Sequence, residues 1–166
     1  MDNIEFSIEN YINQHYKAFQ SLDINSVNNA SDLIISTIHN NKKIITCGNG
    51  GSALTASHYI TDWMKMYNLA TGHKFRGISL TDNIGLTTAY GNDLEYKLIF
   101  SQQLNAIMDK GDLLIVISGS GNSPNIISAL KMAKNLGGST LGVLGYNGGS
   151  ALSICDEIFH VPSWDM

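Results

Sequence analysis

The sequence predicts an α/β fold in which a mostly five-stranded parallel sheet carries helices on both faces and follows an N-terminal pair of helices. Short apolar or β-branched runs alternate with stretches of helical period, and this alternation implies crossover connections between parallel strands. Two of the runs end in glycine- and serine-rich loops that lead directly into helical patterns. The chain has 166 residues, of which 43% are hydrophobic, so it is long enough to bury one substantial core. We therefore expect residues 1–166 to form a single domain.

Each expected element has a local signature. Apolar residues recur at helical spacing over residues 4–19 and again over 27–38, which predicts the helical pair within residues 1–40. Strands are expected at residues 43–47, 75–80, 113–117, 139–144 and 158–161. Helices are expected at residues 53–67 and 124–136, and residues 84–104 are typical of helical or mixed structure.

The composition excludes several classes of partner. The formal net charge is −4 and the basic residues are scattered, so no stripe for nucleic acid or an anionic membrane is expected. Residues 1–20 lack the pattern of a secretory signal, and no window approaches the length of a membrane span. Cys47 and Cys155 have no CxxC spacing and fit reduced thiols in the cytoplasm. Charged residues make up only 14% of the chain, against roughly 25% in an average domain, which favours a homo-oligomer.

Residues 118–123, Ser-Gly-Ser-Gly-Asn-Ser, form the loop that points most clearly to a ligand, and we name it the serine loop. It places three hydroxyls ahead of a helix, and a phosphate monoester needs many donors and the positive end of a helix dipole. The loop has no lysine and matches neither the GxxxxGK[ST] nor the GxGxxG pattern of nucleotide sites. We therefore infer a small phosphorylated ligand. The alternative is an ordinary turn in which serines cap the helix.

A second loop, residues 48–52, follows the first strand with the sequence Gly-Asn-Gly-Gly-Ser, and we name it the glycine loop. In an open parallel sheet, ligands bind beyond the carboxyl ends of the strands. Both loops are expected at that edge. The same residues also suit an ordinary strand-to-helix turn.

His58 and Asp62 lie on the helix after the glycine loop, roughly 180° from the centre of its apolar stripe. At a spacing of four residues the imidazole and the carboxylate approach each other, so the pair can bind a metal ion or transfer protons. The alternative is a solvent-exposed pair that stabilises the helix by a few tenths of a kcal/mol. The functional interpretation needs a neighbour, which a second subunit facing this helix would supply.

Two further segments have less specific patterns. A break in the helical pattern is expected at Gly91, and Asn92 and Asp93, which follow it, form either a turn or a polar contact to a substrate. Residues 145–150 follow a strand, and we interpret this third loop as structural.

Five motifs occur in order along nearly the whole chain: Cys-Gly-Asn-Gly-Gly-Ser (47–52), His58 with Asp62, Tyr-Gly-Asn-Asp (90–93), Ile-Ser-Gly-Ser-Gly-Asn-Ser (117–123) and Val-Pro-Ser (161–163). Together they resemble the sugar isomerase (SIS) domain of the phosphoheptose isomerases. The resemblance implies a three-layer, flavodoxin-like fold and a cytoplasmic homotetramer with pockets at subunit interfaces, in which the N-terminal helices pack on the domain and on neighbouring subunits. It also implies an aldose–ketose isomerase that converts sedoheptulose 7-phosphate to D-glycero-D-manno-heptose 7-phosphate for bacterial surface polysaccharide.

The resemblance further implies roles for individual residues. The expected phosphate contacts are Ser118, Gly119, Ser120 and Ser123. The expected contacts to the rest of the sugar are Asn49, Gly50, Gly51, Ser52, Asn92 and Asp93. His58 and Asp62 are the expected catalytic residues, both as zinc ligands and Asp62 also as the acid/base.

Two departures from the family's pattern bear on catalysis. Asp62 stands where family members usually have glutamate, and its shorter side chain sets the carboxylate back by about 1 Å, a misplacement that affects rates. The family also has a last helix with a glutamine and a histidine, whereas this chain stops at Met166. We expect the natural protein to continue, with the remaining zinc ligands beyond residue 166. Two alternatives stay open: a noncatalytic phosphosugar-binding SIS protein that acts as a regulator or scaffold, and an isomerase of another phosphorylated sugar.

Overall fold

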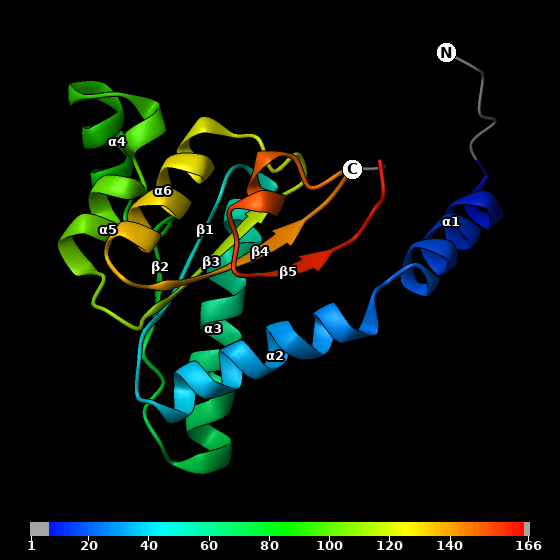
Figure 1. Cartoon of the computed structure of the whole chain (residues 1–166), viewed down its shortest axis with the longest axis horizontal. Coiled ribbons are helices and arrows are strands. Elements are labelled where there is room, and N and C mark those ends of the chain that lie inside the picture. Colours follow the sequence, from blue (N-terminus) through cyan, green and yellow to red (C-terminus); the bar gives the residue numbers. More distant parts are fainter. Residues whose placement is uncertain (1–6, 165–166) are drawn as a thin grey trace.

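The computed structural model describes residues 7–164, with a five-stranded parallel sheet at its centre (Figure 1). The strand order is β2-β1-β3-β4-β5. The strands are β1 (Ile44–Gly48), β2 (Gly77–Ser79), β3 (Leu113–Ser118), β4 (Ser139–Leu144) and β5 (Glu157–His160). The helices are α1 (Ile8–Gln20), α2 (Ile24–His39), α3 (Gly51–Thr71), α4 (Ile84–Asp93), α5 (Ser101–Ile107) and α6 (Pro124–Asn135), with 3-10 turns η1 (Tyr96–Leu98) and η2 (Ser150–Ser153). The predicted α/β fold is confirmed.

The central strands β1 and β3 are buried on both faces, as their apolar or β-branched runs predict, whereas the edge strand β5 is half-buried. Successive side chains of a strand point to opposite faces, so β1 contributes Ile45 to one core and Ile44 to the other. The first core includes Leu104 of α5 and residues of α6. The second includes Ala30 of α2 and Ile60 of α3. Helices on each side of the sheet therefore make three layers.

The N-terminal helical pair is confirmed, and its two helices differ in how they pack. Ser7 caps α1, because its side chain accepts the N–H of Asn10 at 3.1 Å. Asp23 caps α2 in the same way, accepting the N–H of Asn25 at 3.0 Å. α2 lies against the body near β5, whereas α1 lies at the margin of the domain, where it lines a cavity with Phe159 and Val161 and buries none of its residues (Figure 1). In residues 7–164, no helix combines the length and apolar character that crossing a bilayer requires.

The segment 84–104 resolves into α4, η1 and α5. The break expected at Gly91 is wrong, because α4 continues through Gly91 to Asp93. A single glycine costs a helix only about 1 kcal/mol. Here it also brings α4 close to η1, since a Cβ at Gly91 would lie 3.8 Å from the Tyr96 ring.

The strand register places three loops at one edge of the sheet. Gly48 at the end of β1 pairs with Ile117 of β3, and Ser118 pairs with Leu144 at the end of β4. The glycine loop, the serine loop and the third loop therefore leave the sheet together. This carboxyl edge is the place where parallel α/β sheets bind ligands.

Candidate functional site

The serine loop is folded by its own side chains. The hydroxyl of Ser118 accepts the N–H of Gly121 at 3.0 Å, and the hydroxyl of Ser120 accepts the N–H of Asn122 at 3.3 Å. Gly121 has a φ of +61°, in the left-handed region that favours glycine. The loop therefore forms a compact turn at the carboxyl end of β3.

Ser123 tests the idea that the serines are helix caps. It is the N-cap residue of α6, yet within the described chain its side chain makes no capping hydrogen bond. Its backbone carbonyl alone contributes, by accepting the N–H groups of Ile126 and Ile127 at 3.0 and 3.1 Å. The capping interpretation is therefore wrong for Ser123. Its hydroxyl stands at the positive end of the α6 dipole, where an anion is stabilised.

The third loop packs against the serine loop and is hydrogen-bonded to it. Asn122 bridges the two, because its side-chain oxygen accepts both the N–H and the hydroxyl of Ser150, at 2.8 and 2.9 Å. Gly121 packs so closely on Gly148 that a Cβ atom at position 121 would overlap the Gly148 carbonyl. These contacts agree with a structural role for residues 145–150.

The glycine loop leaves open space beside its backbone. Gly50 has a φ of +55°, and no atom lies within 4 Å of the place where a Cβ would stand at Gly50 or Gly51. Gly48 is tightly packed instead, because a Cβ there would collide with the backbone of Ser52. Glycine is thus needed at position 48 for the turn into α3, whereas Gly50 and Gly51 leave room for a ligand.

Asn49 of the glycine loop is held by a residue that the sequence analysis did not single out. The side-chain amides of Asn49 and Asn125 exchange two hydrogen bonds, of 2.9 and 2.7 Å. The hydroxyl of Tyr96 also donates to Asn49 Oδ1, at 3.3 Å. The one available signal for Asn125 was its place two residues after the serine loop. The pair joins the glycine loop to the first turn of α6.

The structure brings His58 and Asp62 together on α3, away from the core. His58 Nε2 lies 2.9 Å from Asp62 Oδ2, and the two side chains are 70% and 56% exposed. His58 is about two turns, roughly 10 Å, along the helix from Gly51. In the single chain the pair has the solvent-exposed arrangement, and its functional interpretation still requires a neighbouring subunit.

Zinc binding requires more ligands than this pair provides. Imidazole and carboxylate are donor types that zinc takes, and catalytic zinc sites have three protein ligands. Among residues 7–164, no three or more His, Cys, Asp or Glu side chains are grouped to hold a metal ion. The described residues alone therefore do not fit a zinc site, and zinc stays a prediction from the family resemblance.

Asn92 and Asp93 occupy the last turn of α4, so a turn at these residues is wrong. Both side chains are exposed, and Asn92 Nδ2 donates to Asp93 Oδ1 at 2.8 Å. α4 packs on η1, whose Tyr96 reaches Asn49. A contact between these two residues and substrate stays a prediction.

The two cysteines are poor nucleophiles. Cys47 directly precedes the glycine loop, but burial raises the pKa of its thiol far above the ordinary value. Burial, together with the neighbouring charge of Asp156, raises the pKa of Cys155 to about 12. Both thiols are therefore protonated at neutral pH, which excludes covalent thiolate catalysis by them.

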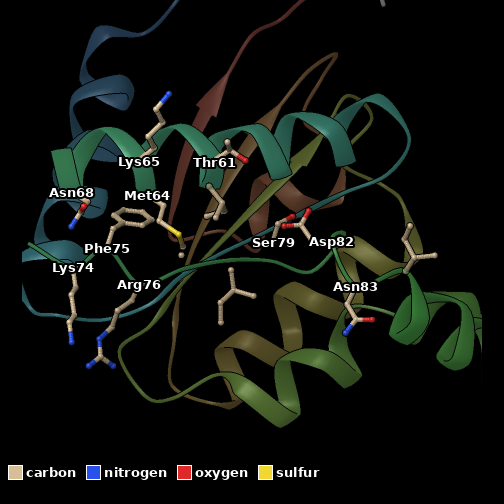
Figure 2. Close-up of a pocket in the computed structure, with 14 residues that line it drawn as sticks. Thr61, Met64, Lys65, Asn68, Lys74, Phe75, Arg76, Ser79, Asp82 and Asn83 are labelled. Carbon is tan, nitrogen blue, oxygen red and sulfur yellow. The ribbon is translucent and has the colours of Figure 1, made fainter. Parts of the chain in front are cut away.

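A groove of about 1200 Å³ lies elsewhere, between α3 and the edge strand β2 (Figure 2). Thr61 and Met64 line it from α3, and Phe75 and Arg76 line it from the segment before β2. No residue of the serine loop or the glycine loop contributes to it. We place the ligand site at the loops, because the hydroxyl donors and a helix N-terminus converge there.

The chain is similar to known proteins over most of its length. Residues 9–145 match the SIS domain family. The phosphoheptose isomerase of Aliarcobacter butzleri is 44% identical over 136 residues, which are 82% of this chain and 71% of the relative. That of Campylobacter concisus is 40% identical over 161 residues, 95% of this chain and 84% of the relative. A solved phosphoheptose isomerase from Francisella tularensis has a TM-score of 0.86 at 28% identity, covering 95% of this chain and 83% of that one.

Proposed function

Because the chain belongs to the SIS domain family and, within it, to the phosphoheptose isomerases, we propose that it converts sedoheptulose 7-phosphate to D-glycero-D-manno-heptose 7-phosphate. The observation that carries this proposal is the serine loop, whose Ser123 hydroxyl is not used as a cap at the N-terminus of α6. A phosphate monoester suits such a site, because hydroxyl donors and the helix dipole act on the same anion. The product would supply heptose for bacterial surface polysaccharide.

In the proposed complex the serine loop binds the phosphate through Ser118, Gly119, Ser120 and Ser123. The sugar chain then passes the open backbone of the glycine loop toward α3. The absence of side chains at Gly50 and Gly51 supports this path, since no atom lies within 4 Å of either Cβ position. The reacting carbons would lie at the far end of the sugar from the phosphate.

The proposed chemistry moves a proton between C1 and C2 of the sugar. Asp62 removes a proton from C1 of the ketose, and O2 gains a proton, which gives the enediol. Asp62 then returns the proton to C2, and O1 loses its hydroxyl proton to give the aldehyde. A carboxylate within hydrogen-bond reach of these carbons can perform both transfers. The 2.9 Å contact with His58 supports the role, because it places an imidazole beside the carboxylate. Asn49 would bind a sugar oxygen.

Proton NMR of sedoheptulose 7-phosphate, incubated with the purified protein in D₂O, tests the proposal. We expect a growing anomeric signal of the aldose product and deuterium at C2, because the transferred proton exchanges with solvent. A parallel sample treated with a chelator and then resupplied with zinc tests the metal prediction. Zinc-independent turnover would contradict that prediction.

The same spectra separate the alternatives. Sedoheptulose 7-phosphate that stays unchanged while its resonances broaden would contradict the isomerase and favour a noncatalytic binding protein. Turnover of another phosphorylated ketose in the absence of any turnover of sedoheptulose 7-phosphate would identify a different isomerase. A sample without protein provides the background rate.

We also propose that the protein is a homotetramer. The support is α1, which buries none of its residues and exposes a run of large apolar side chains, among them Ile8 (72% exposed) and Phe19 (71% exposed). Apolar surface of this extent is typical of an interface. Sedimentation velocity of the purified protein should give a species of four chains, and a monomer at micromolar concentration would contradict the proposal.

A cytoplasmic location belongs to the same proposal. Both cysteines are free thiols in the structure, which suits a reducing compartment.

A further inference from the structure

Asn125 is a buried polar side chain at the place where two ligand loops meet. It is 1% exposed and lies in the first turn of α6, two residues after the serine loop. Its partner Asn49 lies 76 residues earlier in the chain, in the glycine loop. A buried amide is costly unless its hydrogen bonds are made. Asn125 is therefore held in one geometry by its partners.

The hydrogen bonds determine which way both amides point. Asn125 Oδ1 accepts the backbone N–H of Ile126 at 3.0 Å, and an N–H group can only donate. That contact fixes the oxygen of Asn125, so its nitrogen must face Asn49. Asn125 Nδ2 then donates to Asn49 Oδ1 at 2.7 Å, and Asn49 Nδ2 returns a bond to Asn125 Oδ1 at 2.9 Å.

This orientation leaves a defined donor on Asn49. Its oxygen accepts from Asn125 Nδ2 and, at 3.3 Å, from the hydroxyl of Tyr96. One of the two hydrogens of Asn49 Nδ2 bonds Asn125 Oδ1. Within residues 7–164 the other has no hydrogen-bond partner, and its direction is fixed because the amide group is planar. The group that Asn49 has left for a ligand is therefore an N–H and not its carbonyl oxygen, which already accepts two hydrogen bonds.

We propose that Asn125 is a positioning residue: through the paired amides it fixes Asn49 as a hydrogen-bond donor to a sugar oxygen. The role of Asn49 in binding the sugar rests on the proposed function. Because Asn125 follows the serine loop by two residues, it also sets the distance between the phosphate contacts and the sugar contact. Asn125 itself need not touch the substrate.

A double-mutant cycle in binding tests this inference. Isothermal titration calorimetry would measure the affinity for sedoheptulose 7-phosphate in the wild type, Asn49→Ala, Asn125→Ala and the double variant. Asn125→Ala should weaken binding about tenfold when Asn49 is present and less than twofold when position 49 is alanine, because it acts through Asn49. Inorganic phosphate, which needs only the serine loop, should bind all four proteins within about twofold of the wild type.

Three results would overturn the inference. The first is an Asn125→Ala variant that binds the sugar phosphate as tightly as the wild type does. The second is an equal loss in both backgrounds, since a merely structural residue weakens binding whether or not Asn49 is present. A loss of inorganic phosphate binding equal to the loss of sugar phosphate binding would also contradict it, because the defect would then lie in the serine loop.

Two further variants keep the test decisive. Asn125→Asp retains the oxygen that accepts from Ile126 and Asn49 but replaces the donated bond by a carboxylate oxygen that repels Asn49 Oδ1, so it disrupts the pair without emptying the site and covers the case in which Asn125→Ala fails to fold. It should show the same dependence on Asn49. Asn135→Ala, exposed at the other end of α6, is the matched control and should bind like the wild type. All titrations use the Asp62→Asn background, which is expected to bind without turnover, so a chain that binds but does not isomerise removes the proposed function and leaves the cycle readable.

Discussion

Asp62→Asn is expected to lower kcat for isomerisation by about a thousandfold and to change the affinity for sedoheptulose 7-phosphate by less than threefold, since general acid–base groups contribute roughly 10²–10⁴ in rate. Asparagine has nearly the same shape and can still bond His58, which contacts Asp62 at 2.9 Å. It cannot accept a proton from C1 of the sugar. The loss should therefore appear in kcat, measured by NMR initial rates, and not in the calorimetric binding constant.

Two further variants serve as controls for Asp62→Asn. Asp62→Glu restores a carboxylate and should regain much of the activity lost in Asp62→Asn, because the family usually carries glutamate there. Lys65→Gln, exposed on the same helix, is a control that should turn over like the wild type. If Asp62→Asn kept more than a tenth of the wild-type kcat, Asp62 would have no place in the mechanism.

Gly121→Ala is expected to weaken binding of inorganic phosphate and sedoheptulose 7-phosphate by at least about a hundredfold and to destabilise the fold by on the order of 2–4 kcal/mol. Gly121 has a φ of +61°, and a methyl group there would overlap the carbonyl of Gly148. The serine loop and the third loop would have to separate. Separation removes the contacts that hold Ser118 and Asn122. Calorimetry and thermal unfolding report the two effects.

Gly72→Ala is the matched control for Gly121→Ala. Gly72 has a similar φ of +70° at the end of α3, but no atom lies near its Cβ position. Its substitution should cost about 1 kcal/mol of stability and leave phosphate binding unchanged. Ser120→Ala, which removes one hydroxyl and the hydrogen bond that it accepts from the N–H of Asn122, should weaken phosphate binding about tenfold. Normal phosphate binding by Gly121→Ala would show that the phosphate is not held by the serine loop.

Local patterns were sufficient to predict the strands. The apolar run at 113–117 became β3, because an uninterrupted apolar strand is stable only when it is covered on both faces, and the more mixed residues 139–144 became β4. The same reasoning predicted α6 after Pro124, a residue that suits a first helical turn. The break predicted at Gly91 was wrong, because α4 continues through this residue. In the sequence alone, a glycine inside a helix cannot be distinguished from a glycine that ends one.

The site was predictable only in part. Once the strands are parallel, the glycine loop and the serine loop must meet at the carboxyl edge, so their proximity followed from topology. The pairing of Asn49 with Asn125 did not follow, because it depends on the register between β1 and β3 and on the start of α6. Whether Ser123 caps α6 also depends on its rotamer in the folded loop.

The order of the elements, the positions of both loops and the exposed face that His58 and Asp62 share were all predictable, because each depends on spacing within a few residues. Which polar atoms the fold uses, and which it leaves for a ligand, became clear only from the folded chain. Asn125 is used to hold Asn49, Asn122 to hold Ser150, and the side chain of Ser123 makes no capping bond. A hydrogen bond forms between atoms about 3 Å apart, and the backbone brings residues that are distant in sequence to that separation only when the whole sheet has assembled.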